Sequence, residues 1–270
     1  MVKIAVAGAM GRMGSRIAAL SAEYENIRLA GALERKGHPD TGKEFFISGP
    51  AGQGNPPPVR LSDDVFEALA EADVLIDFTQ PASTLSNLKA CVEAGKAMVI
   101  GTTGFTGGQM EEINGLAPRT TVVMAANMSL GINLLLKIVR TMAEALGDDY
   151  DVEIIEAHHR FKKDAPSGTA LKLAQAAAVG LKRNLDDVAV YARHGMTGER
   201  PSRAIGIQTV RAGDIVGEHT VLFGGLGERI EVTHKASSRD TFARGALRAA
   251  LWLQDKGPGL YDMQDVLGLK

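Results

Sequence analysis

Three evenly spaced glycines at the end of the first strand-like run restrict the folds that this 270-residue chain can adopt. The run "VKIAVAG" (Val2–Gly8) is short and apolar, as is typical of a buried strand. Gly8, Gly11 and Gly14 follow in "GAMGRMG", and helical spacing begins within the same stretch. Such a strand–turn–helix unit predicts a dinucleotide site, because the free N–H groups at the helix start attract a pyrophosphate. The plainer alternative is that the glycines only make a tight turn.

An acidic residue supports the nucleotide interpretation. Glu34 ends a second strand-like run, Ile27–Glu34, about 20 residues beyond the glycines, where it could bind an adenosine ribose hydroxyl. A carboxylate at this place favours NADH, whereas an adjacent arginine favours NADPH, and Arg35 comes next. We therefore expect NADH or NADPH without ranking them. Arg12 is a second candidate for the phosphate, or else a solvated surface residue.

Strand-like and helix-like runs then alternate over roughly 125 residues, which indicates a doubly wound parallel sheet of the Rossmann type. The later strands are expected at Asp73–Thr79, Ala97–Thr103 and Thr121–Asn127, and residues 36–58, rich in Gly and Pro, as a long surface loop. The loops "IGTTGF" and "AANMS" follow two of these strands, and small polar residues there suit backbone contact with a nicotinamide ribose and carboxamide.

The pattern changes after Asn127. A helix is expected over Leu130–Leu146, then a strand "DVEIIEAHH", a helix "GTALKLAQAAAVGL" and three strand-like runs with short turns. This order predicts a second, α+β domain with an open mixed sheet. We expect residues 1–127 to form the nucleotide-binding domain and residues 128–237 the second domain. A final helix, Ser238–Gln254, begins the segment 238–270.

Composition excludes several classes of protein. The formal net charge of −2 argues against nucleic-acid or membrane-surface binding. Cys91 is the only cysteine, so no intrachain disulfide can form, and its helical, apolar surroundings predict an inert buried thiol. The first residues lack a signal-peptide pattern and no apolar run approaches the ~20 residues of a membrane span, so we expect a cytoplasmic protein.

The stretch "EAHHRFKKDAPSGTA" (Glu156–Ala170) gathers proton donors and cations just ahead of a helix start. A histidine suits proton transfer near neutral pH, and a lysine supplies a point charge for an anion. The N–H groups at the beginning of the helix offer a second anion site. These residue types together predict a small anionic substrate that must take up a proton.

Read together, "GAMGRMG", "LER", "GTTG", "NMSLGIN" and "EAHHRFKKDAPSGTA" resemble the 4-hydroxy-tetrahydrodipicolinate reductase (dihydrodipicolinate reductase) family of bacterial lysine and diaminopimelate synthesis, in order and over essentially the whole chain. The resemblance implies NADH- or NADPH-dependent reduction of a small cyclic imine with two carboxylates, and loss of water. It also implies a homotetramer built by the second domain and a last helix that returns to the first.

Specific residues follow from the resemblance. His158 matches the proton donor, Lys162 the catalytic lysine, His159 a substrate contact, and Gly168 and Thr169 the carboxylate-binding pair. The cofactor positions fall on Gly8, Ala9, Met10, Gly11, Arg12, Met13, Glu34, Arg35, Gly101, Thr102, Thr103, Ala125, Ala126, Asn127 and Met128. One departure is Ala126, where many members carry proline, and we expect it to alter loop stiffness rather than chemistry.

Alternatives remain for single residues and for the whole chain. His159 could be structural, Lys163 solvated, and Arg160 paired with an acid such as Asp164. His194, His219 and His234 show no metal-ligand spacing, so no metal is expected. The rival functions are reduction of another small dicarboxylic imine or semialdehyde, and a nucleotide-binding sensor without turnover. An acylating dehydrogenase is disfavoured because Cys91 lacks an activating setting.

Overall fold

A computed structural model describes residues 1–49 and 54–270 of the chain, which form two compact units. The first unit comprises Met1–Leu130 and Asp240–Lys270, and the second comprises Gly131–Arg239. Part of the expected loop 36–58 therefore lies outside the described residues.

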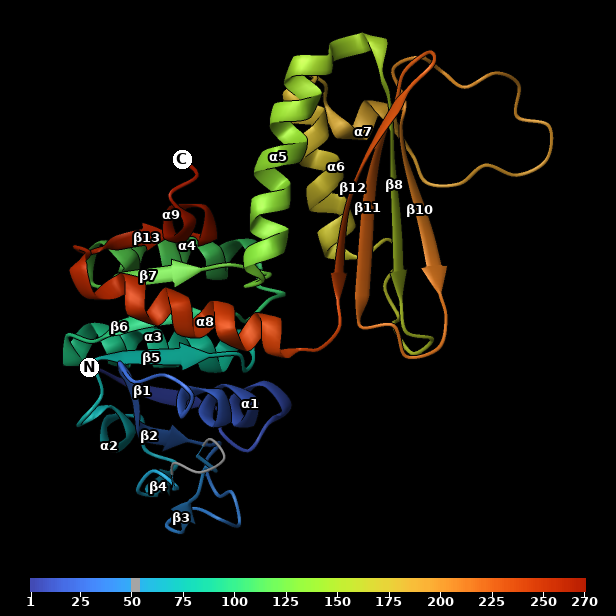
Figure 1. The fold of residues 1–270 in the computed structure, drawn as a ribbon. Helices are drawn as coiled ribbons and strands as arrows, with labels where there is room; N and C mark the ends of the chain where they lie inside the picture. The colour runs from blue at the N-terminus through green and yellow to red at the C-terminus, as the bar shows by residue number, and fades with distance from the viewer. Residues whose placement is uncertain (50–53) are drawn as a thin grey trace. The chain divides into compact units, whose positions relative to one another are not determined.

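The first unit is built on an eight-stranded sheet in the order β13-β7-β6-β5-β1-β2-β4-β3 (Figure 1). All pairs are parallel except β3–β4. The strands are β1 (Val2–Ala7), β2 (Ile27–Leu33), β3 (Glu44–Phe45), β4 (Val59–Ser62), β5 (Val74–Asp77), β6 (Ala97–Ile100), β7 (Thr121–Met124) and β13 (Gly259–Tyr261). Strand order reverses at β1, which pairs with β2 on one side and β5 on the other, and ligands of such sheets bind beyond the carboxyl ends at this point.

Helices cover both faces of this sheet and close two apolar cores. They are α1 (Arg12–Ser21), α2 (Val65–Leu69), α3 (Pro81–Ala94), α4 (Gly107–Leu116), α8 (Asp240–Trp252) and α9 (Met263–Leu267), with short 3-10 turns η1 (Ala117–Arg119) and η3 (Leu253–Asp255). Helix α8 packs beside α1, where Arg16 Nε lies 2.5 Å from Asp240 Oδ1. Its small residues Ala243, Ala246 and Ala250 are fully buried in the same core as Ile4 and Val6 of β1.

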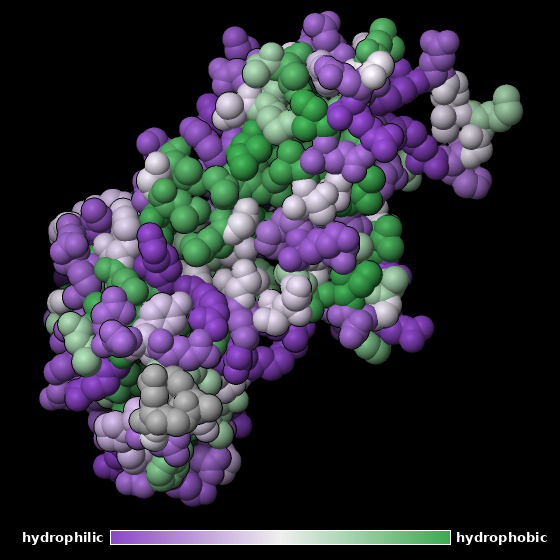
Figure 2. Space-filling model, viewed as in Figure 1, coloured by the Kyte–Doolittle hydropathy of each residue, from purple (hydrophilic) through white to green (hydrophobic). Residues whose placement is uncertain are grey.

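The second unit is a five-stranded mixed sheet in the order β12-β11-β8-β10-β9. Helices α5 and α6 lie along one face (Figure 1), and Figure 2 shows hydrophobic residues gathered over them. On β8 every second side chain from Val152 to His158 is buried, while Ile155 faces the other side and is exposed. The elements are α5 (Leu130–Leu146), η2 (Gly147–Asp149), β8 (Asp151–His158), α6 (Gly168–Gly180), α7 (Leu185–Val188), β9 (Ala189–Val190), β10 (Ile205–Arg211), β11 (Gly217–Gly224) and β12 (Arg229–Ala236).

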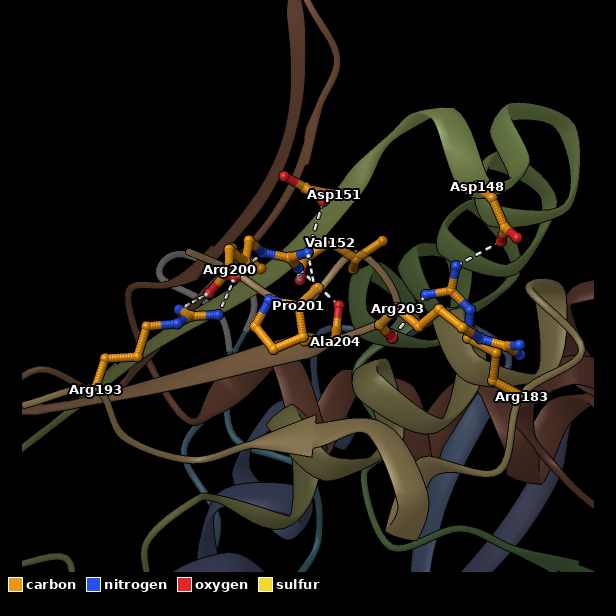
Figure 3. A network of polar contacts seen from close by, with 10 residues as sticks. Asp148, Asp151, Val152, Arg183, Arg193, Arg200, Pro201, Arg203 and Ala204 are labelled. Atoms are coloured by element: carbon orange, nitrogen blue, oxygen red, sulfur yellow. Dashed lines mark hydrogen bonds and ion pairs between the residues drawn. The ribbon is translucent and has the colours of Figure 1, made fainter. Parts of the chain in front are cut away.

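Between β9 and β10, residues 191–204 run without helix or strand and are held by arginines (Figure 3). Arg193 makes a two-pronged ion pair with Glu153 of β8, at 2.9 and 2.7 Å. Arg200 reaches Glu153 Oε1 at 3.0 Å and the carbonyl oxygens of Val152 and Ala204. Gly206 makes room for this, because a Cβ there would lie 1.8 Å from a Glu153 oxygen.

The structure confirms the predicted fold class, a Rossmann-like parallel sheet and an open mixed sheet. The strands of the first unit end one to three residues earlier than expected, because polar side chains turn the chain: Asp77 accepts the N–H of Thr79. The expected loop 36–58 was partly wrong, since β3 lies inside it and pairs with β4. The strands β4, β9 and β13 were missed because each has four residues or fewer and no clear alternation.

Candidate active site

The glycine turn lies at the carboxyl end of β1 and is tightly closed. Gly8 has a left-handed backbone (φ 66°), and Gly11 N–H donates to Gly8 O at 2.8 Å. A Cβ on Gly14 would lie 2.0 Å from Gly8 O, so the first turn of α1 could not lie so close with any other residue. The turn therefore has the shape that a phosphate-binding loop requires.

Glu34 is joined to this turn. Its Oε1 accepts Met10 N–H at 2.9 Å, and its Oε2 accepts Arg35 N–H at 3.1 Å. Each oxygen keeps a free lone pair for a hydroxyl group. The exposed Arg35 side chain follows directly, so acidic and basic groups both stand at the end of β2.

The other predicted cofactor residues follow β6 and β7, two neighbouring strands of the same sheet. Thr102 and Met128 are buried and turned inward: Thr102 Oγ1 lies 3.3 Å from Asp77 Oδ1, and Met128 belongs to the core. Gly101 packs under Phe78, since a Cβ there would lie 2.2 Å from the ring. These segments can thus offer backbone groups to a ligand, together with the exposed Thr103 and Ala126.

In the second unit, the predicted proton donor His158 is the last residue of β8 and is 9% exposed. Its Nδ1 lies 2.5 Å from Glu156 Oε2. The ring packs edge-to-face on His219 of β11, with centroids 5.1 Å apart. Burial lowers the pKa of His158, with further lowering by Lys162 and Arg211, and Glu156 opposes this only in part. The resting imidazole is therefore neutral near pH 7.

Lys162 and the helix start occupy the loop that follows. Lys162 Nζ lies 2.9 Å from Asp164 Oδ1, so Asp164 forms its ion pair with Lys162. The alternative ion pair between Arg160 and Asp164 is not formed. Ser167 is the N-cap of α6 and its Oγ accepts Ala170 N–H at 3.2 Å. Gly168, the first residue of α6, is exposed, and Thr169 is half-buried beside it.

His159 is half-buried, and its Nδ1 has no hydrogen-bond partner among the residues that the structure describes. Lys163 is exposed, in accord with its prediction as a solvated neighbour. The buried Cys91 is inert, because burial and Asp77 raise the pKa of its thiol to about 12. Within residues 1–49 and 54–270, no group of three His, Cys, Asp or Glu side chains could hold a metal ion.

The sequence did not single out three residues of this cluster: Glu156, Arg211 and His219. The strand register explains how they meet, because Glu156 stands opposite Thr209 of β10 and His219 of β11. His219, which the sequence analysis considered only as a metal ligand, belongs to this cluster, since its Nε2 lies 3.1 Å from Ser167 Oγ. The two-residue period of a strand could have placed Glu156 beside His158, but the partners on β10 and β11 depend on long-range pairing.

Known proteins match the chain along its whole length. A family described as "Dihydrodipicolinate reductase, N-terminus" matches residues 2–128, and "Dihydrodipicolinate reductase, C-terminus" matches residues 131–267. The chain belongs to the dihydrodipicolinate reductase family. This confirms the resemblance in the sequence and the expected oxidoreductase class, and it indicates a reductase that binds a nicotinamide dinucleotide and acts on a small molecule.

Individual relatives agree. A protein of Syntrophobacter fumaroxidans named 4-hydroxy-tetrahydrodipicolinate reductase is 56% identical over 270 residues and all of both chains. A protein of Hahella chejuensis with the same name is 54% identical, again over all of both. A dipicolinate-bound dihydrodipicolinate reductase from Paenisporosarcina sp. TG-14 superposes with a TM-score of 0.77 at 27% identity, covering 98% of this chain and 99% of that one.

None of the helices in the described ranges combines the length and the apolar content that crossing a membrane requires.

Proposed function

We propose that the chain reduces 4-hydroxy-tetrahydrodipicolinate to tetrahydrodipicolinate, with loss of water and with NADH or NADPH, in lysine synthesis through diaminopimelate. The observation that carries this is the second-unit cluster: a buried histidine whose Nδ1 faces a carboxylate, a lysine four residues on, and a helix start beside them. The full-length identity of 50–56% to relatives of that name supports the same reaction.

The first unit fits a nicotinamide dinucleotide on its own geometry. Within the turn Gly8–Gly14, a Cβ on Gly14 would lie 2.0 Å from Gly8 O, so the glycines allow the close turn from β1 into α1, and Glu34 is oriented by Met10 N–H. We assign the cofactor to Gly8–Met13, Glu34, Arg35, Gly101–Thr103 and Ala125–Met128. When bound, the nicotinamide supplies the hydride. NADH and NADPH are both expected, with Glu34 binding the ribose and Arg35 the 2′-phosphate.

The second unit supplies binding and proton transfer. His158 gives a proton to the ring carbon after the hydride has arrived, and His159 contacts the substrate. Because the pKa of His158 is lowered in the free protein, a dianionic substrate would favour its protonated form and so load the donor. Lys162 attracts one carboxylate, which must compete with Asp164, and the N–H groups of Gly168 and Thr169 receive the other.

We further propose that residues 128–237 build a homotetramer in the cytoplasm. Support comes from the face of the five-stranded sheet that α5 and α6 do not cover. Its apolar residues Ile155 and Val210 are 41% and 44% exposed, and contact with another subunit would bury them.

The reaction is tested by generating the substrate in situ from pyruvate and aspartate semialdehyde with a synthase, then following the absorbance of NADH or NADPH. We expect loss of absorbance that depends on all components. No loss with either cofactor would favour a sensor without turnover. Oxidation of the cofactor by another small dicarboxylic imine, but not by this one, would favour the rival reductase.

A further inference from the structure

Glu156 is a buried carboxylate with an unusual number of donors. Its side chain is inaccessible to solvent, yet each of its oxygens is fully used. Oε2 lies 2.5 Å from His158 Nδ1 and accepts Arg211 Nη1 at 2.8 Å. Oε1 accepts Arg211 Nη2 at 2.9 Å, Ser167 N–H at 3.0 Å and Thr209 Oγ1 at 3.3 Å. Burying a carboxylate is costly unless charge and hydrogen bonds compensate it, and here both do.

The charge state of Glu156 follows from these donors. Burial acts to raise its pKa, but hydrogen bonds from Arg211, His158 and Ser167 outweigh burial, and the pKa is lowered overall. Glu156 is therefore ionised at neutral pH and can only accept hydrogen bonds. The nitrogen that faces it, His158 Nδ1, must then carry a hydrogen. In a neutral ring this leaves Nε2 bare.

We propose that Glu156, held in place by Arg211, is a positioning residue for His158. It fixes the neutral ring in the Nδ1–H form, so that Nε2 is the nitrogen that takes up and donates the catalytic proton. It also aligns the ring with the start of α6. The first two effects act on the proton donor. The third acts through Ser167 N–H, one residue before Gly168. One carboxylate thus aligns the acid with the predicted carboxylate-binding groups. The catalytic part rests on the proposed function.

The surroundings of Nε2 agree with this role. A Cβ at position 217 would lie 3.1 Å from Nε2, so glycine there keeps this nitrogen uncrowded. The charged or titratable groups around the ring are Glu156 on its own strand, Arg211 on β10, His219 on β11 with His234 of β12 beyond it, and Lys162 and Asp164 in the following loop. His219 does not compete for the proton near neutral pH, because burial lowers its pKa to about 4.

The first test observes the wild-type protein and needs no substrate. In the full-length protein with 15N-labelled histidine, NMR above pH 7 reports which ring nitrogen of His158 is protonated, and His158→Gln assigns the signal. We expect the Nδ1–H form. Protonation on Nε2 instead would overturn the proposal. This result is independent of whether the proposed reaction takes place.

The second test is kinetic and uses Glu156→Gln with Glu153→Gln as its matched control. Glu153 lies on the same strand, pairs with two arginines, and does not touch His158. We expect Glu156→Gln to lower kcat by about 10²-fold or more with KM changed far less, as with a lost orienting acid in a catalytic triad. The fall of kcat/KM with rising pH should begin about one pH unit lower, because the anion that favours protonated His158 is gone.

Glu153→Gln should leave kcat and the pH profile near wild type. If Glu156 were purely structural, Glu156→Gln would lower stability but leave the pH profile of kcat/KM unchanged, and that result would overturn the proposal. If Glu156→Gln does not fold, the wild-type NMR result decides the question. If wild-type protein does not turn over the substrate, the proposed function fails while the assignment of the ring nitrogen stands or falls separately.

Discussion

The two units build their candidate sites from different parts of the chain. In the first unit the site is made of backbone: a glycine turn, the start of α1 and strand ends, with one carboxylate oriented by Met10 N–H. In the second unit it is made of buried and partly buried polar and charged side chains drawn from three strands, with Glu156 at the centre. The backbone site should be sensitive above all to added volume at its glycines, whereas the side-chain site should be sensitive above all to the loss of a charged or proton-carrying group.

The largest effect should come from added volume in the backbone site. Gly14→Val would place a Cβ 2.0 Å from Gly8 O, so the turn must open. Overpacking of this kind costs about 3 kcal/mol or more, which corresponds to about 10²-fold in affinity. We expect NADH binding, measured by calorimetry, to weaken at least that much. Gly115→Val is the control, since nothing lies within 4 Å of its Cβ position; equal losses in both variants would refute the backbone account.

Loss of functional groups in the side-chain site should come next. His158→Gln and Lys162→Ala should each lower kcat by about 10²-fold, the usual scale of lost acid catalysis. Steady-state kinetics with the coupled assay measures this. Lys163→Ala, the exposed neighbour, should stay close to wild type. Near-normal rates for His158→Gln would remove it from its role.

A third prediction concerns acid stability, which should depend on the second unit. Burial lowers the pKa of His219 from 6.5 to about 4. Between these two pH values His219 is protonated in the unfolded chain and neutral in the folded chain. Stability should be full above pH 6.5 and fall as pH drops, by about 3 kcal/mol at pH 4. His158 and His234, also lowered by burial, contribute with the same sign.

Urea unfolding at several pH values between 7.5 and 4.5 measures this slope. The pKa of Glu156 is lowered from 4.5, so this carboxyl contributes little to the pH dependence of stability above pH 4.5. The histidines therefore dominate the pH dependence between pH 7.5 and 4.5. His219→Gln should flatten the slope, and the exposed His194→Gln should not. A His219→Gln variant with an unchanged slope would contradict the assignment.

A smaller effect is expected from Arg35→Ala, which tests the choice between NADH and NADPH. Arg35→Ala should raise the KM for NADPH by about tenfold, the cost of one charge-assisted contact of about 1.5 kcal/mol, and leave the KM for NADH nearly unchanged. Equal effects on both cofactors would show that Arg35 does not read the 2′-phosphate. In that case the contrast between the two sites would be greater, because the first unit would bind its cofactor through backbone groups and Glu34 alone.

The smallest effect compares two helix caps. Ser167→Ala in the second unit should cost about 1–2 kcal/mol, because its buried Oγ caps α6 and also contacts His219. Thr106→Ala, an exposed cap of α4, should cost about 0.5–1 kcal/mol. Urea unfolding of both variants ranks them, and the reverse order would argue against the buried network.

The same contrast explains what the sequence could predict. The glycine turn, Glu34 and the strand alternation are local patterns, and they suffice to predict the parallel sheet, whereas its reversal of strand order at β1 came only from the structure. His158, Lys162 and Gly168 share one stretch and were predicted with the motif. Arg211 and His219 lie more than fifty residues from Glu156, and only the pairing of β8 with β10 and β11 brings them to it. Short strands such as β13 carry too few residues to show a period.

The return of the last segment also sets an order of events during synthesis. The core that begins with Val2 and Ile4 is completed by α8 and α9, and β13 closes the edge of its sheet beside β7. These elements follow the second unit in the chain. The second unit, residues 131–239, is continuous and its own core needs nothing that follows it. The first unit therefore begins before the second in the chain and is completed after it, so its apolar face stays uncovered until α8 and α9 have been made.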